Sequence, residues 1–214
     1  MKKLPFRVHI MEVGPLAVNA FIVEDPAARK AVVVDPGGDG ESLLREIGNL
    51  GLAVEKILLT HGHFDHVGAV GLLREKTGAP VYVHADDLER MLGARRQGML
   101  FGLSVQNPPK PDHLVADGDT VSFGGVDFRV AHTPGHTPGC VCYIAGGMAF
   151  VGDLIFAGSI GRTDLPGGSY ETLIDSVRTR IFTLSDDTVL FPGHGPATTV
   201  GEEKRTNPFF TGGT

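Results

Sequence analysis

The chain has 214 residues, of which 42% are hydrophobic and 21% charged, and its formal net charge is −6. This length fits one large domain over residues 1–214, and the acidic balance argues against a general nucleic-acid-binding surface. No apolar run approaches the roughly 18 residues that a membrane span needs, and no apolar signal-peptide core follows the basic start, so we expect a cytoplasmic protein.

In the first half, apolar runs bounded by glycine, proline and aspartate predict strands, and apolar residues at helical spacing predict helices. The predicted strands are residues 21–23, 31–34, 54–59 and 81–83. The predicted helices are residues 41–50, 67–76 and 86–95.

A Pro- and Gly-rich stretch, residues 98–112, is predicted to be a surface loop, and the chain beyond it is rich in hairpin signals. Glycine pairs separate the predicted strands 120–123 and 126–130, and then 140–144 and 148–151. A helix over 170–184 and a strand over 189–191 complete the pattern. Interleaved strands and helices with glycine hairpins indicate an α/β protein with both parallel and antiparallel pairing.

The two cysteines, Cys140 and Cys142, lie two residues apart on one predicted strand. We expect small buried thiols rather than a disulfide, in keeping with a reducing cytoplasm.

The densest chemical signal is the run Thr60-His61-Gly62-His63-Phe64-Asp65-His66, which directly follows the predicted strand 54–59. Buried imidazoles and carboxylates cost free energy unless they are paired or bound to a metal. The segment therefore predicts a metal-binding loop at a strand end. No Cys-x-x-Cys pair is present, and a three-histidine site with an open position is typical of catalytic rather than structural zinc.

Three more candidate ligands, His136, Asp153 and His194, each follow a predicted strand in a loop containing glycine. His132 competes with His136 for the ligand role. His136 lies deeper in the Pro-Gly loop, and this position together with the family resemblance given below favours His136. Any one of these residues could be an ordinary polar turn residue, but seven together at strand ends favour a metal site, and their number suffices for two metals. No comparable group of candidate ligands accompanies His9, His84 and His113, and we expect structural or surface roles for them.

The set His61-x-His63-x-Asp65-His66 with His136, Asp153 and His194 resembles the metallo-β-lactamase fold superfamily. Shorter segments resemble its compact glyoxalase II-like hydrolases. These segments are Val33-Val34-Asp35-Pro36-Gly37-Gly38, Gly161-Arg162-Thr163-Asp164, Pro192-Gly193-His194-Gly195-Pro196 and Asn207-Pro208-Phe209.

The resemblance implies an αββα sandwich, two mixed β-sheets flanked by helices, with the metals at the rim between the sheets. It implies that His61, His63 and His136 bind one metal, that Asp65, His66 and His194 bind the second, and that Asp153 bridges both. The expected cofactors are two divalent ions, zinc in the first place, with iron or manganese as alternatives. Asp65 and Asp153 are the expected catalytic carboxylates.

The implied reaction is hydrolysis of a thioester such as S-lactoylglutathione by a metal-bridging hydroxide, with no protein nucleophile. Larger glyoxalase II enzymes carry a basic C-terminal segment for the glutathione carboxylates, and we expect that segment to be missing here. The expected partner is a small-molecule thioester, with no nucleic acid or membrane, and the expected assembly is a monomer or small homo-oligomer. Asp35 and Asp164 are candidates for orienting the ligands. Arg162 could pair with Asp164 or meet an anionic substrate.

Three alternatives remain open. An iron-dependent glutathione persulfide dioxygenase would share the fold and the Gly161-Arg162-Thr163-Asp164 segment. A metal-binding module without catalysis is a second alternative, which the open coordination disfavours. Lactone or β-lactam hydrolysis is possible as a side activity, because an activated water can attack many carbonyl groups.

Overall fold

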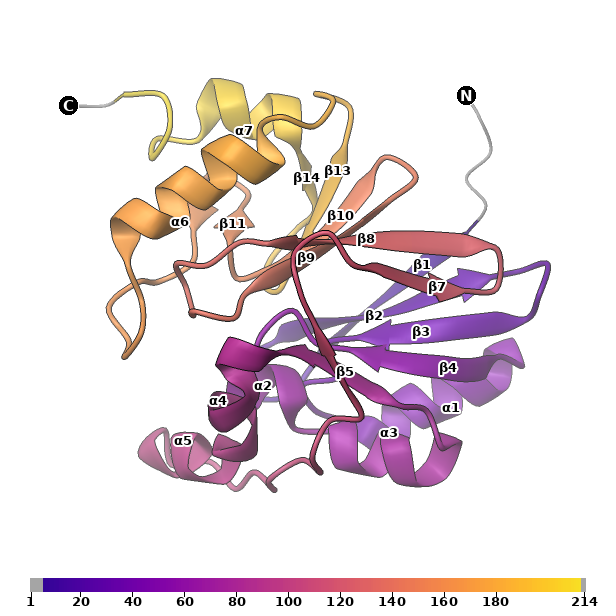
Figure 1. Cartoon of the computed structure of the whole chain (residues 1–214). Coiled ribbons are helices and arrows are strands. Elements are labelled where there is room, and N and C mark those ends of the chain that lie inside the picture. The colour runs from indigo at the N-terminus through magenta and orange to yellow at the C-terminus, as the bar shows by residue number, and fades with distance from the viewer. Residues whose placement is uncertain (1–5, 213–214) are drawn as a thin grey trace.

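A computed structural model describes residues 6–212 of the chain. Two six-stranded sheets pack face to face and helices cover their outer faces (Figure 1). The first sheet consists, in spatial order, of β1 (Arg7–Val13), β2 (Val18–Asp25), β3 (Lys30–Val34), β4 (Ala53–Leu58), β5 (Val81–His84) and β6 (His113–Val115). The second consists of β14 (Thr198–Thr199), β13 (Val189–Pro192), β10 (Met148–Gly152), β9 (Val141–Ala145), β8 (Val126–His132) and β7 (Thr120–Phe123). The predicted αββα fold is confirmed.

Both sheets are mixed. In the first sheet β1, β2 and β3 pair antiparallel, whereas β3 through β6 pair parallel. In the second sheet β10 pairs parallel with β13 and the other pairs are antiparallel. The short strands β11 (Ile155–Phe156) and β12 (Ser159–Ile160) form a separate hairpin.

Strand β2 shows why two layers of helices are needed. All eight of its residues are buried, because its two faces meet different partners. Phe21 faces the second sheet, where its ring lies 5.1 Å from that of Phe150. Ile22 points the other way, into the core under the helices α1 (Gly40–Leu50) and α3 (Val70–Thr77). The helix α6 (Tyr170–Ser176) and the π-helical segment Val177–Ile181 cover the outer face of the second sheet.

The bounds of two predicted helices differ from the structure. The helix predicted over 67–76 starts early, because Val67 ends the short helix α2 (Phe64–Val67) and α3 begins only at Val70. Between them the Ala69 N–H donates to the Pro36 carbonyl. A Cβ at Gly68 would overlap the Gly37 carbonyl oxygen, so this close approach requires a glycine. The prediction for 86–95 covers a 3₁₀ turn at Ala85–Asp87, α4 (Leu88–Leu92) and α5 (Ala94–Leu100), so the predicted loop 98–112 begins later than expected.

The helix predicted over 170–184 begins at Tyr170 as expected but continues from Val177 as a π-helix. The strands β1, β6, β11, β12 and β14 and the helix α7 (Val200–Thr206) were not predicted. No helix within residues 6–212 is long and apolar enough to cross a membrane.

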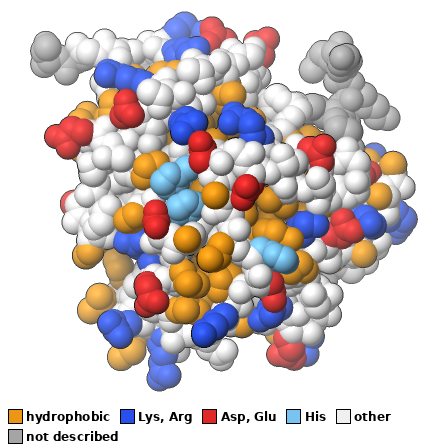
Figure 2. Space-filling view, in the orientation of Figure 1, with side chains coloured by type: hydrophobic (Ala, Val, Ile, Leu, Met, Phe, Trp, Pro, Cys, Tyr) orange, Lys and Arg blue, Asp and Glu red, His pale blue; other side chains and the backbone are white. Residues whose placement is uncertain are grey.

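The two cysteines are free and buried, as predicted. Burial raises the pKa of the Cys142 thiol to about 12, so this thiol stays protonated and is not a nucleophile at neutral pH. On the face shown in Figure 2, acidic and basic side chains are interspersed and neither sign dominates.

Candidate metal centre

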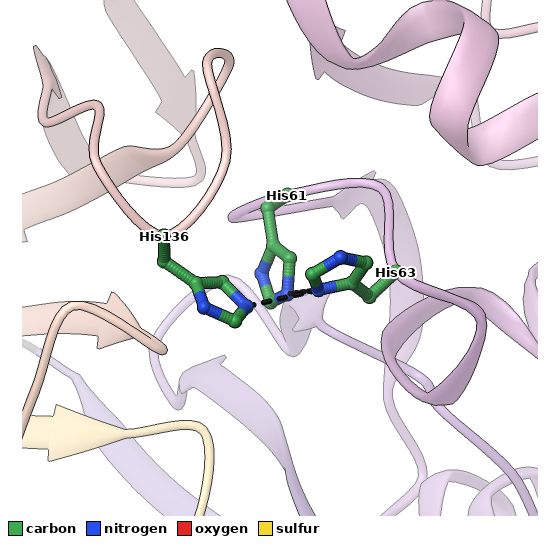
Figure 3. A group of neighbouring side chains, drawn as sticks. All are labelled: His61, His63 and His136. Carbon is green, nitrogen blue, oxygen red and sulfur yellow. Dashed lines mark hydrogen bonds between the residues drawn. The ribbon is translucent and has the colours of Figure 1, made fainter. Parts of the chain in front are cut away.

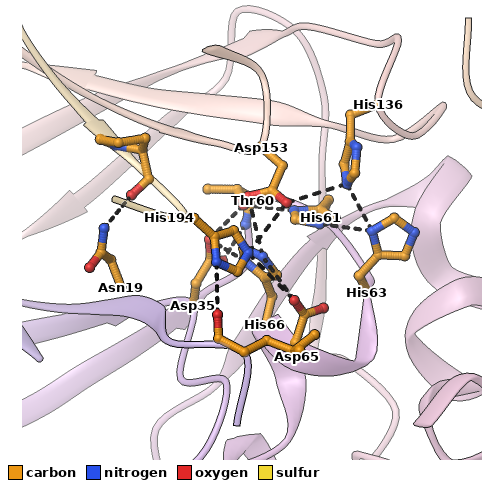
Figure 4. A network of polar contacts seen from close by, with 12 residues as sticks. Asn19, Asp35, Thr60, His61, His63, Asp65, His66, His136, Asp153 and His194 are labelled. Atoms are coloured by element: carbon orange, nitrogen blue, oxygen red, sulfur yellow. Dashed lines mark hydrogen bonds and ion pairs between the residues drawn. The ribbon is translucent and has the colours of Figure 1, made fainter. Parts of the chain in front are cut away.

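Four strand-end loops bring the candidate ligands together at one rim of the sandwich (Figure 4). The loop after β4 and the short helix α2 carry His61, His63, Asp65 and His66. The loops after β8, β10 and β13 carry His136, Asp153 and His194 in turn. All seven predicted site residues therefore meet, and their roles as ligands remain a prediction.

The first group contains the imidazoles of His61, His63 and His136, which point toward one another (Figure 3). His61 Nε2 lies 3.1 Å from His63 Nδ1, which in turn lies 2.9 Å from His136 Nε2. Nitrogen atoms this close around a common centre have the spacing that ligands of one small cation would have.

The second group contains Asp65, His66 and His194. His194 Nε2 lies 3.5 Å from Asp65 Oδ2. Asp153 lies between the groups: one oxygen is 3.4 Å from His66 Nε2, and the other is 3.6 Å from both His136 Nε2 and His194 Nε2. A single carboxylate thus contacts imidazoles of both groups.

Outer hydrogen bonds set the tautomers of four of the imidazoles. His136 Nδ1–H donates to the Arg162 carbonyl at 2.7 Å, and His194 Nδ1–H donates to the Leu16 carbonyl at 3.1 Å. His66 Nδ1–H donates to Asp35, and His61 Nδ1 contacts the Thr60 hydroxyl, whose own proton goes to Asp35. With Nδ1 protonated, each of these rings in its neutral form presents an Nε2 lone pair to the cluster.

Two buried polar atoms in the cluster have no hydrogen-bond partner among the described residues: His66 Nε2 and Asp153 Oδ1. An unpaired buried acceptor is costly, and two that face each other across 3.4 Å are unfavourable unless a proton or a cation lies between them. The donor set of imidazoles and carboxylates suits zinc, iron or manganese. The residues present therefore fit a two-metal site.

Electrostatics divide the cluster into two halves. Burial lowers the pKa of His61 well below its usual value, and that of His63 to about 3, so both rings are neutral at pH 7. Burial alone would also lower the pKa of His66, but the Asp153 and Asp65 carboxylates outweigh it and raise this pKa well above its usual value. The hydrogen bond to Asp65 likewise raises the pKa of His194 against the effect of burial.

The two carboxylates respond in the opposite sense. Burial would raise the pKa of Asp153, but the charge of the His66 imidazolium lowers this pKa below its usual range. The charge of His66 and the hydrogen bond from His194 lower the pKa of Asp65 in the same way. Both carboxylates are therefore ionised at neutral pH and available as oxygen ligands.

The family model for the metallo-beta-lactamase superfamily matches residues 13–194. The chain belongs to this superfamily. It is 39% identical to a protein named hydroxyacylglutathione hydrolase GloC from Haemophilus influenzae, and the match covers 94% of this chain and 97% of the relative.

Two solved structures show the same architecture. The structure of TTHA1623 in a di-iron-bound form superposes with a TM-score of 0.87 and 43% identity, covering 94% of this chain and 99% of the other. The BLEG-1 B3 metallo-beta-lactamase superposes with a TM-score of 0.91 and 38% identity, covering 96% and 100%. Family membership together with the His/Asp clusters makes the chain a metal-dependent hydrolase with a site suited to two ions.

The two aspartates proposed to orient ligands of the superfamily site differ. Asp35 is fully buried and holds His66 Nδ1 at 3.0 Å as well as the Thr60 N–H at 2.8 Å. Its backbone has φ +49°, a left-handed conformation that is uncommon outside glycine and is retained here by these contacts. Asp164 is exposed and pairs with Arg162 through two bonds of 2.8 Å, so Arg162 reaches His136 only through its backbone carbonyl.

Asp87 is a central residue that the sequence did not single out. Its buried carboxylate accepts hydrogen bonds from the Gly62 N–H at 2.7 Å, the Gly139 N–H at 3.1 Å, the Thr137 hydroxyl at 2.8 Å and the Arg90 guanidinium at 2.7 Å. It therefore joins the loop of His61 and His63 to the loop of His136. Asp87 lies in the helix predicted over 86–95, next to the exposed Asp86, and nothing in the local sequence indicates that its carboxylate is buried.

Asn19 performs a similar task for the last ligand loop. From β2 in the first sheet, its side-chain amide donates to the Pro192 carbonyl at 3.0 Å and to the Gly195 carbonyl at 2.8 Å. These two bonds bracket His194 and tie its loop to the opposite sheet. Figure 4 shows Asn19 with one of them.

The competing histidine, His132, lies outside the cluster. Its ring stacks on that of His84 with centroids 4.3 Å apart and planes within 9° of parallel, and its Nε2–H donates to the Pro138 carbonyl. His84, Asp86 and His132 lie near enough to suggest another metal site. However, stacked parallel rings hold their in-plane lone pairs in separate planes and cannot direct both at one ion.

A pocket of about 1070 Å³ opens onto the cluster. His63, Asp65, His136, Asp153 and His194 line its floor, while α4, α5 and the segment 156–166 supply its walls. Its size suits a small organic substrate.

Proposed function

We propose that the chain hydrolyses thioesters, with S-lactoylglutathione as the first substrate to test. The observation that carries this proposal is the convergence of imidazole lone pairs and two ionised carboxylates on the floor of a substrate-sized pocket. The similarity to a protein named hydroxyacylglutathione hydrolase supports this choice of substrate class.

We assign His61, His63 and His136 to the first metal, Asp65, His66 and His194 to the second, and Asp153 to both. Ions held there would lower the pKa of a bound water and polarise a substrate carbonyl. Zinc, iron and manganese all fit these ligands, and the di-iron form of one relative supports iron as an alternative to zinc.

The chain's own residues would position the reaction. The hydrogen bonds to Nδ1 hold the imidazoles in one tautomer, so the site needs little reorganisation when substrate binds. Asp65 faces the pocket as an ionised carboxylate and can accept a hydrogen bond from the attacking water. No serine or cysteine nucleophile is required, which agrees with the buried, protonated state of the Cys142 thiol.

The decisive experiment compares zinc-, iron- and manganese-loaded protein in two assays. We expect S-lactoylglutathione to release free thiol without oxygen uptake, and Asp153→Asn to abolish this activity. Asp187→Asn, a change at an exposed aspartate of the second half, is the matched control and should retain it. Inert thioesters, together with oxygen consumption on glutathione persulfide by the iron form alone, would instead establish the dioxygenase alternative.

A further inference from the structure

An apolar wall stands beside the metal centre. It consists of Leu16 in the turn between β1 and β2, Leu100 and Phe101 at the end of α5, and Phe156 in β11, all of which line the substrate pocket. Leu100 is 82% exposed and Phe101 49%, although burying such side chains is favourable. Large exposed apolar groups that gather at a pocket commonly mark a binding surface.

Three of the four wall residues are anchored to the metal centre. The Phe101 ring lies 5.2 Å from that of Phe64, the neighbour of Asp65. The Phe156 ring lies edge-on to His194 at 6.1 Å, and the Leu16 carbonyl accepts the His194 Nδ1–H. The wall is therefore continuous with the site rather than a separate surface patch.

We propose that this wall binds an apolar acyl chain, so that the preferred substrates are thioesters of extended apolar acids rather than of small hydroxy acids. This inference rests on the proposed thioester hydrolysis. A lactoyl group is too small to cover the wall, and its hydroxyl finds no hydrogen-bond partner in the side chains of Leu100 and Phe101. A longer alkyl chain that leaves the carbonyl over the metal centre would remove these side chains from water.

The first test is a series of acetyl, butyryl and hexanoyl thioesters of glutathione, assayed with the metal-loaded enzyme. A methylene buried on apolar surface contributes about 0.8 kcal/mol at most. We therefore expect kcat/KM to rise about two- to fourfold per methylene, or roughly 16- to 250-fold from acetyl to hexanoyl. Leu100→Ser should reduce this rise markedly. Leu114→Ser, at a leucine of β6 that is 54% exposed and outside the pocket, should leave it unchanged.

A binding measurement separates this inference from the proposed function. S-hexylglutathione, with five more methylenes, should bind the metal-loaded protein about 30- to 1,000-fold more tightly than S-methylglutathione, and Leu100→Ser should remove most of the difference. If thioesters are not hydrolysed but binding still strengthens with chain length, the hydrolase proposal is wrong and the inference that the wall binds an apolar chain is supported. If thioesters are hydrolysed at rates independent of chain length, or if Leu100→Ser keeps the full dependence, the wall inference is wrong.

Discussion

Replacing Asp87 by alanine should destabilise the protein and weaken metal binding, although Asp87 is not one of the candidate ligands. The change removes the acceptor for two backbone N–H groups, at Gly62 and Gly139, and leaves the Arg90 guanidinium, 17% exposed, without its carboxylate. Each buried donor left unpaired costs about 1–3 kcal/mol, and breaking a buried ion pair costs about 3–5 kcal/mol. These costs overlap, so we expect a loss of about 3–5 kcal/mol in the free energy of unfolding.

For a chain of this length, such a loss corresponds to a fall in Tm of about 6–20 °C. The metal-free protein should be melted first, so that lost metal does not add to the effect. Asp87→Asn keeps one acceptor oxygen and should lose about half as much. Asp86→Ala, at the preceding exposed aspartate, is the matched control and should change stability by less than about 0.5 kcal/mol.

A second readout distinguishes positioning of the site from general stability. Because Asp87 joins the loops that carry His61, His63 and His136, its loss should weaken metal binding at the first site about 10- to 100-fold at a temperature where the variant is still folded. Competition with a chelator of known affinity measures this change. An Asp87→Ala protein that melts within about 2 °C of the parent and competes equally for metal would refute the reasoning.

Three further predictions concern the ligands themselves. Asp65→Ala should retain one metal per chain and lose the second, together with most hydrolysis; elemental analysis beside a rate measurement checks this, and two retained metals would contradict it. His132→Ala should keep both metals whereas His136→Ala should lose the first, and the reverse pattern would show that the wrong histidine was assigned. Because carboxylates raise the pKa of His66 and His194, a second-site metal must displace protons that His61 and His63 of the first site do not hold. Lowering the pH from 8 to 6 should therefore release the second metal first, as a metal titration at each pH would show, and equal loss from both sites would count against this division.

Local patterns predicted much of the fold. Glycine hairpins and the helical spacing of Leu43 and Ile47 located strands and the helix α1 within one or two residues. The predicted bounds of two helices were wrong. The helix α4 ends locally at Gly93, and α2 and α3 are separated where the backbone at Gly68 lies against Gly37. Periodicity along the chain carries no information about such contacts.

The same limit applies to the site. The seven candidate ligands could be predicted from the sequence because so many histidines and aspartates at strand ends are unusual. The family resemblance then assigned them to two metals. The roles of Asn19 and Asp87 could not be predicted. Each side chain hydrogen-bonds backbone groups that are distant in sequence, and both residue types are common in turns and on surfaces. Only the folded structure reveals which backbone amides lack another partner.

The division of the ligands between the two sheets links metal supply to folding. His61, His63, Asp65 and His66 follow a strand of the first sheet, whereas His136, Asp153 and His194 follow strands of the second. Only the assembled sandwich offers the complete set, so bound ions stabilise it by mass action, by about 2.7 kcal/mol at a free metal concentration one hundred times the Kd. The contiguous His61–His66 stretch can also chelate metal in the unfolded chain, which reduces that gain. The thermal stability of this protein should therefore depend on the metal content of its surroundings as well as on its own sequence.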